Sequence, residues 1–269
     1  DIGELAVYGT VNDLAVCGAQ PLYLSAGFII EEGCLMEELW RIIQSMRKAA
    51  DKAEVKIVTG DTKVVDRGKG DKIYINTSGV GVVYKGVDIS PRRIQSGDKI
   101  ILNGKIAEHG IAILSAREEF DFQTSVKSDT APLNGLIKEI LQVCPDIHMM
   151  RDPTRGGLSS ALNEIAGKAQ KGIRLEEKQI PIDQEIKAVC EILGLDPLYI
   201  ANEGKVLLFV PPAEVSKVLK VMHSQTYGKE AVVIGEVVDE HPGRVVMKTL
   251  IGSIRVVDMI SGEQLPRIC

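Results

Sequence analysis

The segment RDPTRGGL at residues 151–158 combines two arginines, an aspartate and a pair of glycines directly ahead of an apolar helical pattern. Glycines that open a helix expose backbone N–H groups at the positive end of the helix dipole, an arrangement that favours phosphate. Arg151 and Arg155 supply forked donors for phosphate oxygens, and Asp152 supplies a hard oxygen for Mg²⁺. The spacing matches neither the Walker nor the Rossmann glycine pattern. We interpret the segment as a phosphate site of another type; an ordinary polar helix start is the alternative.

Three further segments place polar side chains in apolar surroundings. Asp13 lies in TVNDLA at residues 10–15, where an unpaired buried carboxylate would be costly unless it bound a cation, although a solvent-facing Asp is the simpler interpretation. GDTK at residues 60–63 follows an apolar strand pattern and offers a carboxylate, a hydroxyl and an ammonium to Mg²⁺ and phosphate, or forms a polar turn. Glu203, in ANEGK at residues 201–205, is a candidate base, metal ligand or turn residue.

The chain ends in LPRIC, with Cys269 as its last residue. This stretch has no helical or strand periodicity and is expected to be a mobile tail. A terminal thiol on such a tail can react at one site and carry a group to another. Arg267 favours the thiolate and the terminal carboxylate opposes it, so the two effects on the thiol pKa compete. An incidental exposed cysteine is the alternative.

The composition narrows the class of protein. The 269 residues are 45% hydrophobic and 26% charged, which predicts a globular chain of one large or two moderate domains. A formal net charge of −5 with interleaved acids and bases, and only 4% aromatic residues, argue against nucleic acid as a partner. No apolar run approaches the ~20 residues of a membrane span, and no export signal precedes the five cysteines, which form no C-x-x-C pair. We therefore expect no membrane partner and a cytoplasmic location.

Helices and strands alternate without a strict βαβ rhythm, which predicts an α+β fold. Helical patterns occupy residues 2–16, 36–52, 107–119, 132–143, 157–171, 184–193 and 212–223. Strand patterns occupy residues 22–30, 55–59, 72–84, 99–103, 206–210, 232–237 and 244–248. A turn near residues 94–98 suggests a domain boundary, which gives domains at 1–97 and 98–258 and a tail at 259–269.

The order of the motifs resembles that of the HypE family of hydrogenase maturation proteins, within the PurM-like, AIR synthetase-related ATP-binding superfamily. The matching pieces are GTVNDLAVCGAQPLYLSAGFIIEEG at residues 9–33, VTGDTKVV at 58–65, the His109-Gly110 pair, RDPTRGGL, ANEGK and the terminal PRIC, which is the most specific. The resemblance runs through essentially the whole chain. It implies a PurM-like fold in which an N-terminal α/β domain pairs with its copy in a homodimer. An α+β domain then covers a nucleotide cleft.

The resemblance also implies a reaction, that of an ATP-dependent carbamoyl dehydratase. The partner HypF makes a carbamoyl group from carbamoyl phosphate, and the group is placed on the sulfur of Cys269. ATP then phosphorylates the carboxamide oxygen, and loss of phosphate leaves a thiocyanate. The cyano group passes to iron on the HypC–HypD complex for the [NiFe] hydrogenase active site.

Residue roles follow from the same resemblance. Asp13, Asp61 and Asp152 are expected to hold Mg²⁺, which would neutralise the triphosphate of ATP. The expected catalytic residues are Cys269, Lys63, which steadies phosphate, Glu203, which removes the amide proton, and His109, a second candidate base. The expected nucleotide-binding residues are Asn12, Asp13, Asp61, Thr62, Asp152, Thr154, Arg155, Gly156 and Gly157.

Two departures from the family pattern bear on activity. Family members begin well before Asp1, with a Gly-rich segment and a Thr-Asp-Ser strand of the ATP site, so we expect an amino-terminal segment to be lacking here. Glu108 stands where the family usually has Asp. Two alternatives therefore remain: a sister ATP-dependent synthetase of the same superfamily, or a scaffold that holds assembly partners without turning over ATP.

Overall fold

The computed structural model describes residues 1–117 and 125–260. Within it the chain divides into two compact units: the first holds Asp1–Lys85 and Thr130–Lys138, and the second holds Gly86–Asp129 and the chain from Glu139 onward. The domain boundary at residue 97 was predicted from a turn in the sequence. Residues 86–97 pack with the second unit here because Ile94 is buried in its core and Gly97 donates a backbone hydrogen bond to Val237.

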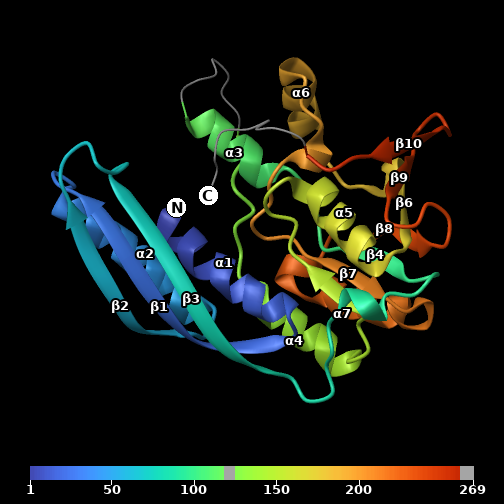
Figure 1. Ribbon diagram of the computed structural model, residues 1–269, viewed down its shortest axis with the longest axis horizontal. Coiled ribbons are helices and arrows are strands. Elements are labelled where there is room, and N and C mark those ends of the chain that lie inside the picture. The colour runs from blue at the N-terminus through green and yellow to red at the C-terminus, as the bar shows by residue number, and fades with distance from the viewer. Residues whose placement is uncertain (118–124, 261–269) are drawn as a thin grey trace. The chain divides into compact units, whose positions relative to one another are not determined.

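The first unit is a three-stranded sheet with two helices on one face (Figure 1). The central strand pairs in parallel with one neighbour and antiparallel with the other. Its elements are α1 (Ile2–Val16), β1 (Ala19–Glu31), α2 (Met36–Lys52), β2 (Lys56–Val65) and β3 (Ile73–Val83), in the sheet order β2-β1-β3. Val7, Val11, Leu24, Met46 and Ala50 are buried between sheet and helices. Burial of one sheet face and one stripe of each helix stabilises this layer pair.

The opposite face of that sheet is apolar and open. Because side chains alternate along a strand, the residues that alternate with buried Leu24 and Ala26 point away from the helices. Tyr23, Ile29, Tyr74, Val80 and Val82 on this outer face are 46% to 61% exposed. An apolar surface of this kind marks an interaction site.

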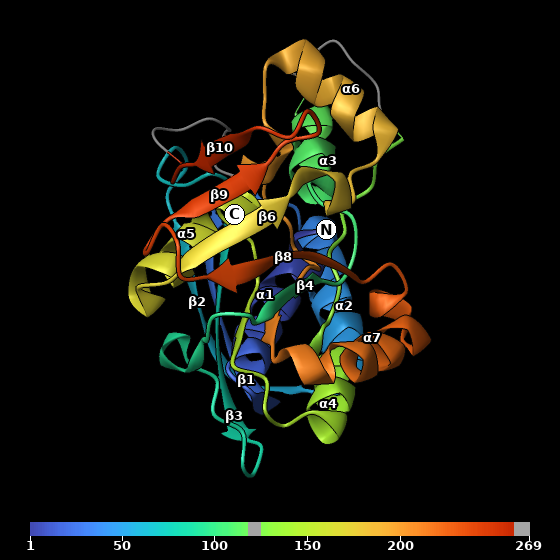
Figure 2. The ribbon, with the colours of Figure 1, turned by 90° about the vertical axis from the view of Figure 1, so that its right-hand side faces the viewer.

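The second unit is built on a seven-stranded sheet of order β10-β9-β6-β8-β4-β7-β5 (Figures 1 and 2). Neighbouring strands are antiparallel except for β6 and β9, which are parallel. Helices α3, α5 and α6 share one hydrophobic core with the sheet. The strands are β4 (Lys99–Leu102), β5 (Met149–Arg151), β6 (Gly172–Glu176), β7 (Leu207–Val210), β8 (Val232–Val238), β9 (Val245–Lys248) and β10 (Ile254–Val257). The helices are α3 (Glu108–Ala116), α4 (Asn134–Val143), which begins in the first unit, α5 (Gly157–Ala169), α6 (Gln184–Leu193) and α7 (Val215–Ser224).

The mixed two-domain fold predicted from the sequence is confirmed, and so are the helices at residues 2–16, 36–52 and 184–193. The strand prediction at residues 55–59 was too short, and the polar turn considered for residues 60–63 is wrong, because these residues belong to β2. Residues 60–65, GDTKVV, continue β2 to Val65. Pairing with β1 is made by backbone groups, so it does not depend on the polarity of these side chains. Strands β5, β6 and β10 were not predicted from the sequence. None of the helices in the described ranges is long and apolar enough to cross a membrane.

Candidate functional site

Three of the motifs converge in the second unit on the side chain of Asn202. Its Oδ1 accepts a hydrogen bond from the backbone N–H of Ala107 at 2.8 Å, beside the start of α3. Its Nδ2 donates to the carbonyl of Pro153 at 2.9 Å, within RDPTRGGL, and to that of Ile200 at 3.1 Å. Asn202 is 1% exposed, so all of these bonds are sheltered from water. This one amide joins the segments around residues 107–110, 151–158 and 201–205.

Glycines permit the close approach of these segments. Gly110 donates to the carbonyl of Ala201 at 3.2 Å. Gly157, at the start of α5, has φ +58°, and a Cβ there would lie 2.5 Å from the carbonyl oxygen of Leu198 and 2.6 Å from that of Ile200. Its N–H donates to the carbonyl of Thr154 at 3.0 Å. The glycine pair predicts an amide that is free for phosphate, but the N–H of Gly157 closes the turn that begins the helix.

A buried ionic cluster lies beside Asn202. The Nζ of Lys205 is 2.9 Å from Glu108 Oε2 and 3.1 Å from Asp129 Oδ2. Burial by itself would lower the pKa of Lys205, but the two carboxylates outweigh it and raise the pKa above its ordinary value. The Asp129 carboxylate also accepts hydrogen bonds from the N–H groups of Glu203 and Gly204, each at 3.1 Å. This arrangement holds a lysine charged in a nearly dry site.

The cluster opens onto a cavity of about 430 Å³. The lining residues are Asn103, Gly104, Glu108, Asp129, Gly204, Lys205, Thr226, Tyr227, Lys229 and Glu230. Asp129 and Lys205 were not among the residues selected from the sequence. Only the polar triplet Ser-Asp-Thr at residues 128–130, which precedes an apolar helical pattern, could have drawn attention to Asp129.

His109, the second candidate base, is completely buried on the first turn of α3. Its Nδ1 lies 2.8 Å from the hydroxyl of Ser128, within hydrogen-bonding distance. Burial lowers the pKa of His109, and the nearby Asp129 carboxylate offsets only part of that effect. The Nε2 atom has no hydrogen-bond partner among the described residues. A neutral imidazole whose Nε2 atom has no partner can accept or donate one further hydrogen bond, depending on its tautomer.

The charged residues of RDPTRGGL differ in their exposure to solvent. Asp152 is 9% exposed, with its Oδ1 3.9 Å from Nε of Arg151. Arg151 also pairs with Glu164 on α5 at 3.1 Å. Arg155 is exposed and Thr154 is half-buried. A carboxylate and an exposed guanidinium on one turn are groups that fit a magnesium-bound phosphate.

The predicted residues of the first unit have different surroundings. Asn12 is buried and bonds to the backbone of residues 131 and 133, which fastens that returning segment to α1. Asp13 is exposed on the same helix. Asp61, Thr62 and Lys63 are exposed on β2, and Asp61 Oδ1 accepts from the N–H of Thr62 at 2.8 Å.

The strand register separates two of the expected Mg²⁺ ligands. Asp61 and Lys63 pair with Gly27 and Ile29, so they lie on the outer face of the sheet, whereas Asp13 belongs to a helix on the other face. Asp152 is in the second unit. Across the described ranges, no three His, Cys, Asp or Glu side chains are grouped so as to hold a metal ion. The shared magnesium site therefore stays a prediction, and Cys269 lies outside the described residues.

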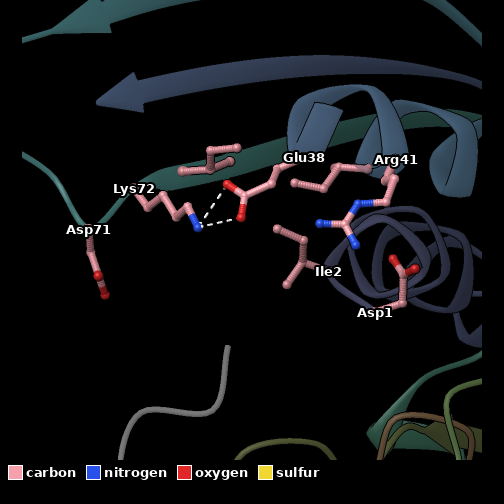
Figure 3. A pocket seen from close by; sticks show the side chains of 8 residues that line it. Asp1, Ile2, Glu38, Arg41, Asp71 and Lys72 are labelled. Carbon is pink, nitrogen blue, oxygen red and sulfur yellow. Dashed lines mark hydrogen bonds and ion pairs between the residues drawn. The ribbon is translucent and has the colours of Figure 1, made fainter. Parts of the chain in front are cut away.

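A further cavity, of about 480 Å³, lies in the first unit where α1 and α2 begin (Figure 3). Arg41 and Glu38 reach into it from α2, and Glu38 forms an ion pair with Lys72 at 2.8 Å. Figure 3 also places Asp1 beside the Arg41 guanidinium. None of the predicted site residues that the structure describes lines this cavity.

Comparison with known proteins gives matches along the whole chain. Residues 1–83 match the family described as AIR synthase related protein, N-terminal domain, and residues 95–248 match the corresponding C-terminal domain. The chain is 51% identical, over all its 269 residues and 77% of the relative, to carbamoyl dehydratase HypE of Cupriavidus necator. A crystal structure of hydrogenase maturation protein HypE in complex with ATP superimposes with a TM-score of 0.95 at 46% identity, covering 100% of this chain and 82% of that one. HypE in a HypE–HypF complex gives a TM-score of 0.93 at 48% identity, covering 97% and 85%.

Proposed function

The chain belongs to the HypE family of carbamoyl dehydratases, built on the two AIR synthase related domains, and we propose that it dehydrates a carbamoyl group on Cys269 at the expense of ATP. The observation that carries the proposal is the identity to carbamoyl dehydratases along the entire chain. A sister enzyme of the superfamily does not account for that identity. The cyano group so formed is donated to the active-site iron of a [NiFe] hydrogenase.

The chemistry of the second unit is suited to this step. A carboxamide oxygen is a poor leaving group, and transfer of the ATP γ-phosphoryl group to it makes phosphate the leaving group. Removal of the two N–H protons and departure of phosphate then leave S–C≡N. Glu203 is our base for the first proton, with His109 the second candidate, because both are buried and held by hydrogen bonds next to the ionic cluster.

ATP and Mg²⁺ are proposed as co-substrate and cation. Asp13 and Asp61 are exposed, so a cation can reach either carboxylate without disturbing the core. At Asp152 a bound cation would compete with Arg151 for the carboxylate. Mg²⁺, when bound, neutralises charge on the triphosphate. The remaining contacts to phosphate are proposed to come from Thr62, Lys63, Thr154, Arg155 and Gly156. Replacement of Asp13, Asp61 and Asp152 by Asn, one at a time, tests each ligand through the magnesium dependence of ATP affinity.

A homodimer formed through the outer face of the three-stranded sheet is part of the proposal. That face exposes Tyr23, Ile29, Tyr74 and Val80 at 46% or more, and a second copy would remove them from water. Since Asp61 and Lys63 lie on the same face, dimerisation would also bring them to the interface. A Val80→Asp variant should be monomeric in sedimentation experiments; an unchanged dimer would refute this surface.

HypF and the HypC–HypD complex are proposed as partners in a cytoplasmic pathway. The choice of HypF as a partner is supported by the crystal structure in which a relative of this chain forms a complex with HypF. Intact-mass measurement after incubation with carbamoyl phosphate, ATP and HypF is the test. We expect one carbamoyl group to be gained on Cys269 and one water then to be lost. A carbamoyl adduct on another residue, or an unchanged mass with partner binding intact, would favour the scaffold alternative.

A further inference from the structure

Asp129 makes an unusual set of contacts for a residue outside the predicted site. One carboxylate oxygen accepts from the N–H of Glu203 and the other from the N–H of Gly204. The second oxygen also receives the ammonium of Lys205 at 3.1 Å. The side chain is 1% exposed, and both of its oxygens accept hydrogen bonds from within the protein. Asp129 thus binds three consecutive residues, 203–205, from 74 positions earlier in the sequence.

Two amide bonds to one rigid carboxylate fix the peptide planes on both sides of Glu203. The direction of its Cα–Cβ bond, and hence the reach of its carboxylate, follows from those planes. The preceding residue, Ser128, lies 2.8 Å from Nδ1 of His109. The Ser128-Asp129 pair therefore contacts both residues that we name as candidate bases.

We propose that Asp129 is a positioning residue for dehydration, which aims the side chain of Glu203 by clamping the backbone of residues 203–204. The inference rests on the proposed function. The simpler possibility is that Asp129 only compensates the buried charge of Lys205, with Glu108 as the other anion at 2.9 Å. The two possibilities differ in what happens when the charge of Lys205 is also removed.

The test uses the carbamoylated protein and follows loss of water by mass spectrometry in a single turnover with ATP. Asp129→Asn removes one acceptor from the clamp and leaves a donor facing an N–H group. Asp129→Asn combined with Lys205→Met has the same clamp defect and no ammonium left for Asp129 to compensate; the Glu108 carboxylate, 28% exposed, then loses its partner but can be solvated by water. Misplacement of a base by about 1 Å slows a reaction by roughly 100-fold, so we expect both variants to dehydrate at least about tenfold more slowly. The ATP concentration for half-maximal rate should stay within about twofold.

Asp98 provides the matched control in the same unit. It is also a buried carboxylate, 2% exposed, which accepts from the N–H of Gln95 at 2.8 Å and pairs with His148 at 2.7 Å. Asp98→Asn should lower thermal stability as Asp129→Asn does, without slowing dehydration. A double variant that regains the wild-type rate would overturn the positioning role, as would equal slowing by Asp98→Asn. Absence of dehydration in the wild-type protein would instead count against the proposed function.

Discussion

Replacement of Gly157 by Ala should destabilise the second unit strongly, although it adds a single methyl group. The backbone at this position has φ +58°, which costs a non-glycine residue about 1–2 kcal/mol. The new Cβ would lie 2.5 Å and 2.6 Å from the carbonyl oxygens of Leu198 and Ile200, well inside normal contact. Because those atoms are backbone, they can yield only by moving the chain, which costs about 1–3 kcal/mol. We expect a total loss of about 2–5 kcal/mol.

Gly167 offers a control in the same helix, α5. A Cβ there would meet nothing within 4 Å, and no positive φ is required. Alanine is the better helix former by about 0.8–1 kcal/mol, so Gly167→Ala should stabilise the helix slightly. The two single-methyl changes are thus expected to act in opposite directions.

Thermal unfolding followed by circular dichroism measures both variants. For a unit of this size, 1 kcal/mol corresponds to about 2–4 °C in Tm, so Gly157→Ala should lower the transition by about 5–15 °C. Gly167→Ala should leave it unchanged or raise it. Equal transitions for the two variants would refute the close packing argued for Gly157. An intact transition with weakened ATP affinity would restore the phosphate role that the sequence suggested.

Three other outcomes follow from the structure. Asn202→Asp should cost about 3–5 kcal/mol in urea unfolding, because a carboxylate would face the carbonyls that the amide now donates to; a loss below 1 kcal/mol would contradict this. Burial raises the pKa of both Cys144 and Cys190 to about 11, so peptide mapping should find them unmodified by iodoacetamide at pH 8 in the folded protein and modified in urea. The hydrogen bond from Lys99 holds the pKa of Glu236 below its ordinary value, so its stabilising effect exists above about pH 4.3 and is lost as pH falls through the lowered pKa. The stability difference between wild type and Glu236→Gln should accordingly shrink as the pH falls through the lowered pKa, and a difference that grew on acidification would contradict this sign.

Most of the helices and longer strands could be predicted because their apolar residues repeat at a helical or strand period over ten or more positions. The three missed strands have three to five residues, and an arginine interrupts or ends their short apolar runs (MMR, GIRLE and IRVV), whereas the equally short β4, β7 and β9 each contain at least three consecutive apolar residues. The polar half of β2 could not be predicted for another reason. It is an edge strand whose residues 60–64 are all exposed, so nothing in its side chains reflects the backbone pairing with β1.

The residues of the candidate site also fall into those that a local sequence motif predicts and those whose role depends on residues distant in the sequence. RDPTRGGL, the His-Gly pair and ANEGK were recognisable as motifs, and the structure joins them through Asn202. Asp129 could not be selected, because its importance depends on lying beside residues that follow it by 74 positions. Gly157 was selected for a free amide that is in fact bonded to Thr154. A local pattern identifies a residue type; only the fold decides which partner that residue meets.

The stretch from residue 201 to 206 explains why polar residues gather here at all. It is buried throughout yet belongs to no strand or helix, so its backbone groups need partners other than a sheet ladder. Side chains provide them: Asp129 accepts from residues 203 and 204, and Asn103 accepts from Val206 at 2.8 Å and donates to Gly204 at 3.1 Å. These acidic and amide side chains use their polar atoms to hold the backbone of residues 203–206 in place. Within this stretch, Glu203 is the residue whose peptide groups Asp129 holds on both sides, and this is why we name its side chain as the one that Asp129 positions.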